Sequence, residues 1–240
     1  MALPISHGRG TNTTSYTSVA FAHSASPDDV KLVNIWPAVG TGNSSADLVP
    51  TIVEYTKPEM TWGYEVQKGA INPGSKPLEW FKLLLQEQDA PLPASQNRLD
   101  HIEGRENAIT ALSEVNERFG GLDISRETPE QETKKILDEL NITTVQVIAD
   151  FLEKIKETTL ENIERTYWMQ SEIDSKVQWI LTVPAIWKDA AKNSMIRAAR
   201  QAGFGERGVD FQLISEPECG ATYSLKVIQP NNLSVFASFQ

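Results

Sequence analysis

A strand, helix and strand pattern between residues 177 and 214 constrains the fold of this chain more than any other feature. Residues 177–183 read Val-Gln-Trp-Ile-Leu-Thr-Val, nearly all apolar, which is typical of a strand covered on both faces. Pro184 ends that strand, and Asp189 can cap a helix that runs to Ala202. Residues 211–214 form a second strand, which the right-handed crossover rule sets parallel to the first. The pattern predicts an α/β protein.

The first quarter of the sequence favours antiparallel β structure instead. Alternating and β-branched residues predict strands, and turn residues Ser-Pro-Asp-Asp at 26–29 predict that the first two form a hairpin. A loop rich in Gly, Ser and Asn is predicted at 40–45. The predicted strands are 16–22, 30–36, 51–55 and 62–66. Together with the parallel pair they predict a mixed sheet flanked by helices.

Helical patterns occur in three further places. Apolar residues from Trp80 to Leu85 share one stripe of a helix that begins near residue 78. The clearest helix starts at Thr143 or Thr144 and ends near residue 167. Its predicted inner face consists of Ile148, Leu152, Ile155, Thr159 and Ile163. A capping box at 215–218 opens a last helix, and the weakly periodic residues 90–133 are interpreted as a loosely helical insertion.

Charge and composition restrict the partners and the compartment. The 240 residues carry 22 Lys and Arg against 32 Asp and Glu, a net charge of −10, which argues against nucleic acid or an anionic membrane as the main partner. No apolar run approaches the roughly 18 residues of a membrane span. The N-terminus lacks the features of a signal peptide, and Cys219 has no second cysteine with which to pair. We therefore expect a cytoplasmic protein.

The carboxyl ends of the two parallel strands are the expected place for a ligand. Glu216 and the loop after Pro184 should face one crevice there, with Lys192 one turn into the intervening helix. Glu216 orients a water molecule, holds the hydration shell of a metal ion, or only stabilises a helix N-terminus, and Asp189 is read as a cap. The three histidines lie far apart without other metal-ligand residues at suitable spacing, so no metal site is predicted. Cys219 is interpreted as a small core residue.

Two motifs in order resemble the heat shock protein 70 family. Residues 180–192 read Ile-Leu-Thr-Val-Pro-Ala-Ile-Trp-Lys-Asp-Ala-Ala-Lys, and residues 213–221 read Leu-Ile-Ser-Glu-Pro-Glu-Cys-Gly-Ala. They are similar to the T-V-P-A and N/S-E-P signatures of that family's actin-like ATPase domain. Residues 79–85, Glu-Trp-Phe-Lys-Leu-Leu-Leu, fit a divergent, chaperone-related branch of it. The resemblance can be followed from about residue 16 to the end.

The resemblance implies the first lobe of a two-lobed actin-like, or ribonuclease H-like, fold that closes on Mg-ATP. Residues 1–50 would supply the hairpin part of this lobe, 51–141 a mainly helical subdomain insertion, and 142–240 the β-α-β part, with the second lobe absent. The family's catalytic glutamate falls on Glu216, and its interlobe switch proline on Pro184. Lys192 occupies the position of a relay arginine, and Lys82 that of the lysine that contacts the transferred phosphate.

The phosphate loops depart from the family pattern. The family has an apolar strand that runs into D-x-G-T-T, whereas residues 10–16 contain no aspartate and no apolar strand is predicted before them. The remaining cofactor-binding candidates in this segment are Gly10, Thr11, Thr13, Thr14, Ser15 and Tyr16. The second phosphate loop would follow a strand that is predicted near residues 233–236. We therefore expect weak or absent binding of Mg-ATP and impaired hydrolysis.

Three functions stay open from the sequence. The first is a degenerate relative of the heat shock protein 70 family that is deficient in ATP hydrolysis. The second is a non-catalytic interaction module that docks on a chaperone, a co-chaperone or a second copy of itself through the surface that a second lobe would cover. The third is a fragment of a longer ATPase that carries the second lobe.

Overall fold

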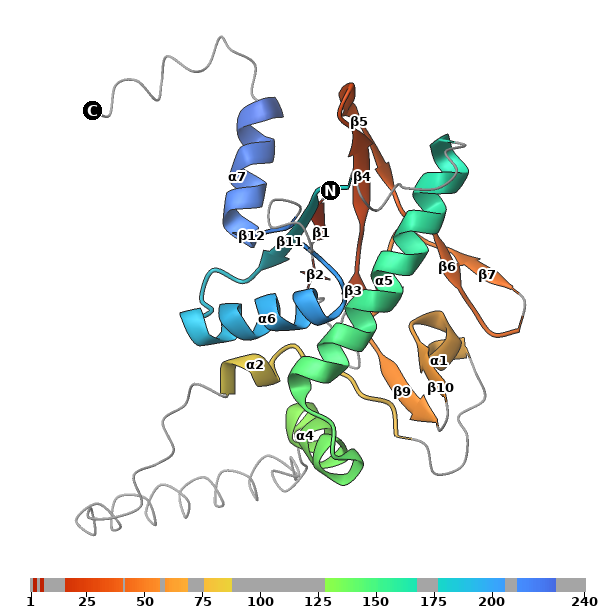
Figure 1. Cartoon of the computed structure of the whole chain (residues 1–240), viewed down its shortest axis with the longest axis vertical. Coiled ribbons are helices and arrows are strands. Elements are labelled where there is room, and N and C mark those ends of the chain that lie inside the picture. The colour runs from red at the N-terminus through yellow and green to blue at the C-terminus, as the bar shows by residue number, and fades with distance from the viewer. Residues whose placement is uncertain are drawn as a thin grey trace, which may run out of the picture.

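The structure is a computed structural model, and it describes residues 2–3, 5–6, 16–40, 42–56, 59–68, 76–87, 128–167, 177–205 and 211–227. Strands and helices of the described chain form one body in which a long helix crosses a central sheet (Figure 1). None of the described helices combines the length and the apolar character that crossing a membrane requires.

Strands from both ends of the described chain build the central sheet. Its order is β12, β11, β1, β4, β5. The bounds are β1 Ala2–Leu3, β4 Ala20–His23, β5 Ser26–Leu32, β11 Trp179–Val183 and β12 Phe211–Ser215. β11 runs parallel to both β12 and β1, whereas β4 runs antiparallel to β1 and β5. The predictions of a parallel pair and of a mixed sheet are confirmed.

β1 corrects one expectation from the sequence. A strand does precede the segment that begins with Gly10, and it lies between β11 and β4 in the middle of the sheet. Its pairs are Ala2 with Ile180 and Leu3 with Leu181. The strand has only two residues, too few for an alternation to be visible in the sequence.

Three small sheets complete the N-terminal part. β2 Ile5–Ser6, β3 Tyr16–Thr17 and β8 Val49–Pro50 form one of them. β6 Ile35–Pro37 pairs with β7 Asn43–Ser45, and β9 Val53–Thr56 pairs with β10 Glu59–Trp62. The predicted strands 16–22 and 30–36 are therefore each divided between two sheets, and the predicted loop at 40–45 contains a strand.

Two local predictions from the sequence are wrong, one for a turn and one for a strand. The hairpin of β4 and β5 turns at Ser24 and Ala25, so that residues 26–29 belong to a strand and not to the turn. Of the predicted strand 62–66, only Trp62 lies in a strand, where it is the last residue of β10. Helix α1 Tyr64–Lys68 begins after Gly63. Gly63 has a φ of +57°, and a Cβ atom there would lie 2.7 Å from Cγ2 of Val49, so only glycine fits this reversal.

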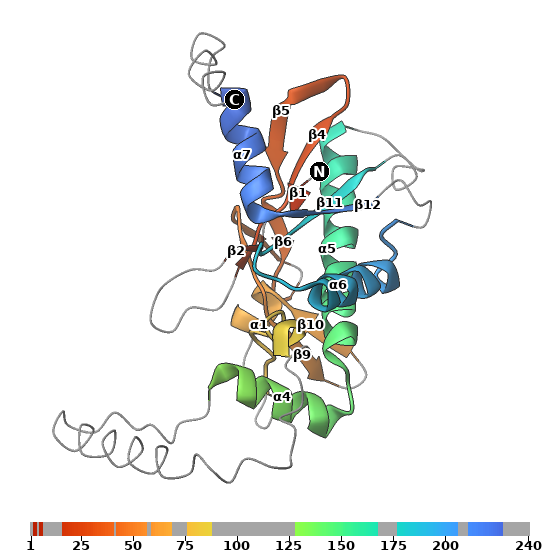
Figure 2. The same ribbon diagram turned by 90° about the vertical axis from the view of Figure 1, so that its left-hand side faces the viewer.

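The helices pack mainly on one side of the central sheet. α5 Thr144–Tyr167 and α6 Asp189–Gln201 lie on one side, and α7 Glu216–Val227 lies on the other (Figure 2). α4 Pro129–Leu140 precedes α5 and begins with a capping box between Thr128 and Gln131. The predicted long helix is confirmed, and the hydroxyl of Thr143 accepts a hydrogen bond from the amide of Gln146 at its start.

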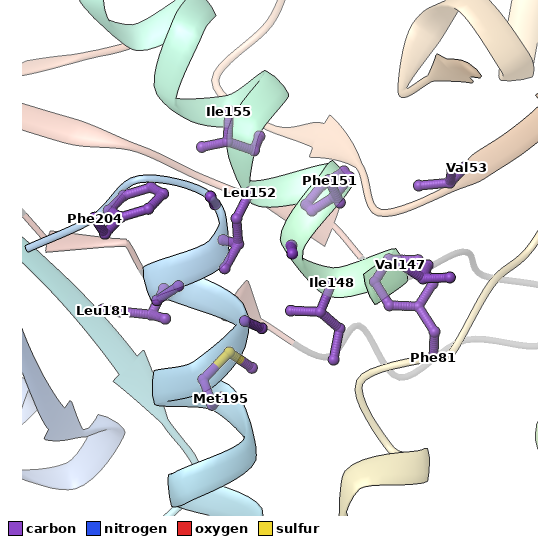
Figure 3. Close-up of a cluster of buried hydrophobic side chains, with 14 of the residues drawn as sticks. Val53, Phe81, Val147, Ile148, Phe151, Leu152, Ile155, Leu181, Met195 and Phe204 are labelled. Atoms are coloured by element: carbon purple, nitrogen blue, oxygen red, sulfur yellow. The ribbon is translucent and has the colours of Figure 1, made fainter. Parts of the chain in front are cut away.

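The core lies where α5, α6 and the central sheet meet (Figure 3). All five predicted inner-face residues of α5 are buried. Phe151 of this helix packs edge-on against Trp62 and Phe81 at ring-centroid distances of 5.8 Å each. The helix predicted from residue 78 is shorter than expected: Leu78 pairs with Val53 in a β-bridge, and α2 spans only Leu84–Glu87. Residues 90–127 and 233–236 lie outside the described ranges.

Candidate functional site at the carboxyl ends of the parallel strands

Lys82 lies in a tight turn that leads into α2. Trp80 begins the turn with a φ of 60°, and its carbonyl accepts a hydrogen bond from the amide of Leu83 at 2.9 Å. Phe81 is 2% exposed and anchors the turn to α5. The turn directs the next side chain inward, so that the side chain of Lys82 is only 6% exposed. A buried lysine requires a special explanation, because this residue type is almost never fully buried without a partner.

Glu216 begins α7 directly after β12. A reciprocal capping box fixes this junction: the amide of Ser215 donates to Oε2 of Glu218 at 2.8 Å, and the amide of Glu218 donates to Oγ of Ser215 at 3.3 Å. The predicted capping box is thereby confirmed. The side chain of Glu216 is 37% exposed, so the site opens toward solvent on the side of this carboxylate.

Lys82 and Glu216 meet although they are far apart in the sequence. Nζ of Lys82 lies 3.7 Å from Oε1 of Glu216, an ion pair that is too long for a good hydrogen bond. The same Nζ lies 5.4 Å from the ring centroid of Trp187, within the range of a cation–π interaction. Trp187 belongs to the loop after β11, where its amide donates to the carbonyl of Pro184 at 3.2 Å. The ammonium group thus has contacts with two other segments of the chain, α7 and the loop after β11.

Burial and one nearby carboxylate act in opposite directions on the ammonium group of Lys82. Burial lowers the pKa of Lys82 from 10.5 to about 8, and the negative charge of Glu216 opposes this shift only in part. Among the described residues, Nζ of Lys82, Oε1 of Glu216 and Nε1 of Trp187 are buried atoms without a hydrogen-bond partner. Two donors and one acceptor therefore remain available at or beside one cluster.

The other predicted site residues lie around this cluster or outside the described ranges. Lys192 is half-buried in the first turn of α6. Two hydrogen bonds with Ser215 lower the pKa of Glu218, and the positive charge of Lys192 lowers it to a smaller extent. Asp189 is not a cap, because Lys188 is the N-cap residue and has no side-chain capping bond. Cys219 is half-buried rather than a core residue.

Of the predicted phosphate loop, residues 10–16, the structure describes only Tyr16. Ser6 of β2 and Tyr16 of β3 are register partners, so the residues on either side of the segment 7–15 are neighbours. Tyr16 is half-buried, and it lies in a different sheet from β11 and β12. Gly10, Thr11, Thr13, Thr14 and Ser15 lie outside the described ranges. Within those ranges, no three His, Cys, Asp or Glu side chains gather as the ligands of a metal ion would.

Trp187 is the site residue that sequence reasoning missed. The sequence patterns gave it no role in the site, and it is only 3% exposed. Its contact with Lys82 depends on the turn at residues 80–83, which no local pattern predicts. The only sequence signal was its place directly after the first parallel strand, in a loop where ligands often bind.

Comparison with known proteins gives a partial similarity. The chain is 36% identical over 88 residues to heat shock 70 kDa protein 12A of Homo sapiens and of Mus musculus, which is 36% of this chain and 13% of those proteins. It is 38% identical over 85 residues to human heat shock 70 kDa protein 12B, 35% of this chain and 12% of that protein. No protein-family model matches the chain.

These similarities support a distant link to the heat shock 70 family. The matched stretch is shorter than the span over which the sequence motifs were followed, and it covers a small part of each relative. The mixed α/β architecture is consistent with an actin-like ATPase type of fold.

Proposed function

We propose that this chain binds the phosphate groups of Mg-ATP at the Lys82 and Glu216 site and hydrolyses ATP slowly or not at all. The observation that carries the proposal is the buried ammonium of Lys82, 3.7 Å from Glu216 at the carboxyl ends of parallel strands. A crevice at that edge of an α/β sheet is the usual place for a ligand.

The unpartnered ammonium group of the site fits a phosphate group. The ammonium of Lys82 can donate to a phosphate oxygen, and its positive charge would offset part of the negative charge of the triphosphate. In a water-poor site such an interaction is stronger than in bulk water, because the effective dielectric constant is lower. The motif around Lys82, residues 79–85, resembles the heat shock protein 70 family, and that resemblance implies the same role for Lys82.

Glu216 would act on the attacking water. Its Oε1 accepts no hydrogen bond among the described residues, and it can accept one from a water molecule placed beside the terminal phosphate. When bound, Mg²⁺ would neutralise phosphate charge and help to orient the triphosphate. Lys192 would contribute a second positive charge from α6, without the bidentate contacts of an arginine.

Impaired hydrolysis is proposed because two positions differ from the family pattern. Residues 10–16 contain no aspartate, and Lys192 stands where the resemblance implies an arginine. Loss of a positioning group lowers the rate of the chemical step far more than it lowers binding when that group acts mainly in the transition state.

Thermal unfolding with and without Mg-ATP tests the proposal. A ligand that binds the native state stabilises it by RT ln(1 + [L]/Kd), so saturating Mg-ATP should raise the Tm of the unmodified chain by several degrees. Lys82→Met should abolish this rise. Lys76→Met is the matched control, because Lys76 forms an exposed ion pair with Glu139 elsewhere and should leave the rise intact.

The outcomes separate binding from hydrolysis. No rise in the unmodified chain, or an equal rise in Lys82→Met, would exclude phosphate binding at this site. Steady ATP turnover that Glu216→Gln abolishes would contradict the impaired-hydrolysis part and leave the binding part standing.

A second candidate is a non-catalytic interaction module. It is favoured by α7, where Tyr223 and Leu225 are 70% and 55% exposed. A direct test measures binding to the nucleotide-binding domain of a heat shock 70 protein. Tyr223→Asp should weaken that binding, and unchanged binding would count against this function.

A further inference from the structure

Trp187 has the geometry of a positioning residue for Lys82. The ammonium of Lys82 lies 3.7 Å from Glu216 and 5.4 Å from the centre of the Trp187 ring, so it has contacts with a carboxylate and with an aromatic ring. Lys82 and Trp187 are 5% and 3% exposed, respectively, so water screens their contact little. Glu216 is more exposed, and a ligand can approach from its side.

The two contacts differ in what an incoming phosphate does to them. A phosphate group next to the ammonium competes with the carboxylate of Glu216, since both are anions that need the same charge. The indole ring is neutral, and it attracts a cation through its quadrupole without competing for the anion. Its attraction for the ammonium therefore persists whether carboxylate or phosphate occupies the other side.

We propose that Trp187 keeps the ammonium of Lys82 charged and in place, so that Lys82 can exchange Glu216 for a phosphate group without moving. This inference rests on the proposed phosphate site and adds a positioning residue to it. Glu216 from α7 is the only charged group that acts appreciably on Lys82 among the described residues. Burial disfavours the charged form of Lys82, and loss of the ring would remove a contact that favours the ammonium over the neutral amine.

Two substitutions of similar size separate the aromatic face from simple filling of space. Trp187→Phe keeps an aromatic ring, whereas Trp187→Met keeps apolar volume without one, and both leave a comparable space behind. The readout is the pKa of Lys82 in the nucleotide-free chain, measured by NMR from the titration of its ¹³Cε signal in lysine-labelled protein. Lys82→Arg assigns that signal by removing it.

The expected result is a lower pKa of Lys82 in Trp187→Met than in Trp187→Phe. A desolvated cation–π contact predicts a difference of up to about one pH unit, or about tenfold in the protonation equilibrium. Affinity for Mg-ATP at pH 9 should fall by about the same factor in Trp187→Met and less in Trp187→Phe. Equal pKa values in the two variants would overturn the inference.

The same experiment distinguishes failure of the inference from failure of the proposed function. If the pKa of Lys82 differs between the two variants but the unmodified chain does not bind Mg-ATP, the effect of the ring on Lys82 is supported and the exchange of Glu216 for a phosphate group is excluded. If the pKa of Lys82 is equal in the two variants and the unmodified chain binds Mg-ATP, the positioning role of Trp187 is excluded and the proposed phosphate site stands.

Discussion

Helices α5 and α7 differ in how much of each is buried against the rest of the chain. α5 has 24 residues and contributes buried side chains along nearly its whole length. α7 has 12 residues, and every residue from Gly220 to Leu225 is exposed. The two helices also lie on opposite sides of the central sheet (Figure 2).

The difference indicates that α5 contributes mainly to stability and that α7 contributes a residue of the candidate site. α5 is fixed by apolar packing against α6 and the sheet, which is the main favourable term in folding. α7 is fixed at its first turn, by the capping box of Ser215 and Glu218 and by the ion pair of Glu216 with Lys82. The carboxylate of the candidate site therefore lies at the one end of α7 that the rest of the chain holds in place.

The largest effect is expected in α5. Leu152→Ala removes a side chain that is 2% exposed and packs in the core (Figure 3). Lost burial together with the cavity left behind should lower the free energy of unfolding by about 2–5 kcal/mol. Urea denaturation of the full chain measures this value. A loss below about 1 kcal/mol would mean that α5 is not the main packing element that its burial implies.

Lys82→Met tests whether the site is maintained at the expense of stability. The pKa of Lys82 is lower in the folded chain, about 8, than its ordinary 10.5. The unfolded chain therefore binds more protons between these values, so the stability of the unmodified chain should rise with pH from about 8 to 10.5. Below pH 8 the buried charge costs up to about 3 kcal/mol, which methionine should recover.

The measurement is the free energy of unfolding of both chains across that pH range. Lys82→Met should be more stable at pH 7, and its advantage should shrink as the pH rises toward 10.5. Lys76→Met, whose side chain is 55% exposed before substitution, should show no such trend. If Lys82→Met is less stable than the unmodified chain at pH 7, the ion pair with Glu216 outweighs the cost of burial.

The contrast between α5 and the N-terminal strands explains how much the sequence could predict. α5 was predictable because its apolar residues recur with helical spacing over several turns. The parallel strands were predictable because a nearly continuous apolar run next to proline has few other interpretations. Strands of two to four residues, such as β1, carry too few positions for a pattern, so their pairing depends on contacts with distant segments.

The candidate site was predictable only as separate residues. Glu216 follows a strand at the expected edge of the sheet, and Lys82 stands in a motif that resembles a known family. Their meeting depends on the positive φ of Trp80 and on the burial of Phe81 against α5. Those are tertiary effects, which local propensity does not encode.

A smaller effect is expected at the start of α7. Ser215→Ala removes the hydroxyl that accepts a hydrogen bond from the amide of Glu218, and loss of such a cap costs about 1 kcal/mol. Hydrogen bonds with Ser215 also lower the pKa of Glu218 in the folded chain. Its contribution to stability is therefore present at neutral pH and is lost as the pH falls through that lowered pKa. The variant should lose less stability on acidification than the unmodified chain does.

The same experiment tests whether the first turn of α7 positions Glu216. Mg-ATP should raise the Tm of Ser215→Ala more than it raises the Tm of the unmodified chain, since a less firmly held Glu216 competes less with the phosphate for Lys82. An unchanged rise would mean that the ion pair with Lys82 alone is sufficient to hold Glu216.

The smallest effect is expected from Leu225→Ala, which makes in α7 the same change as Leu152→Ala in α5. Leu225 is 55% exposed, so alanine removes little buried surface and has a slightly better helix propensity. Urea denaturation should give a free energy of unfolding within about 0.5 kcal/mol of the unmodified chain. A loss near that of Leu152→Ala would show that this side chain is buried in solution, as it would be against a second molecule. In that case the loss should diminish on dilution, because a contact between molecules depends on concentration and packing within one chain does not.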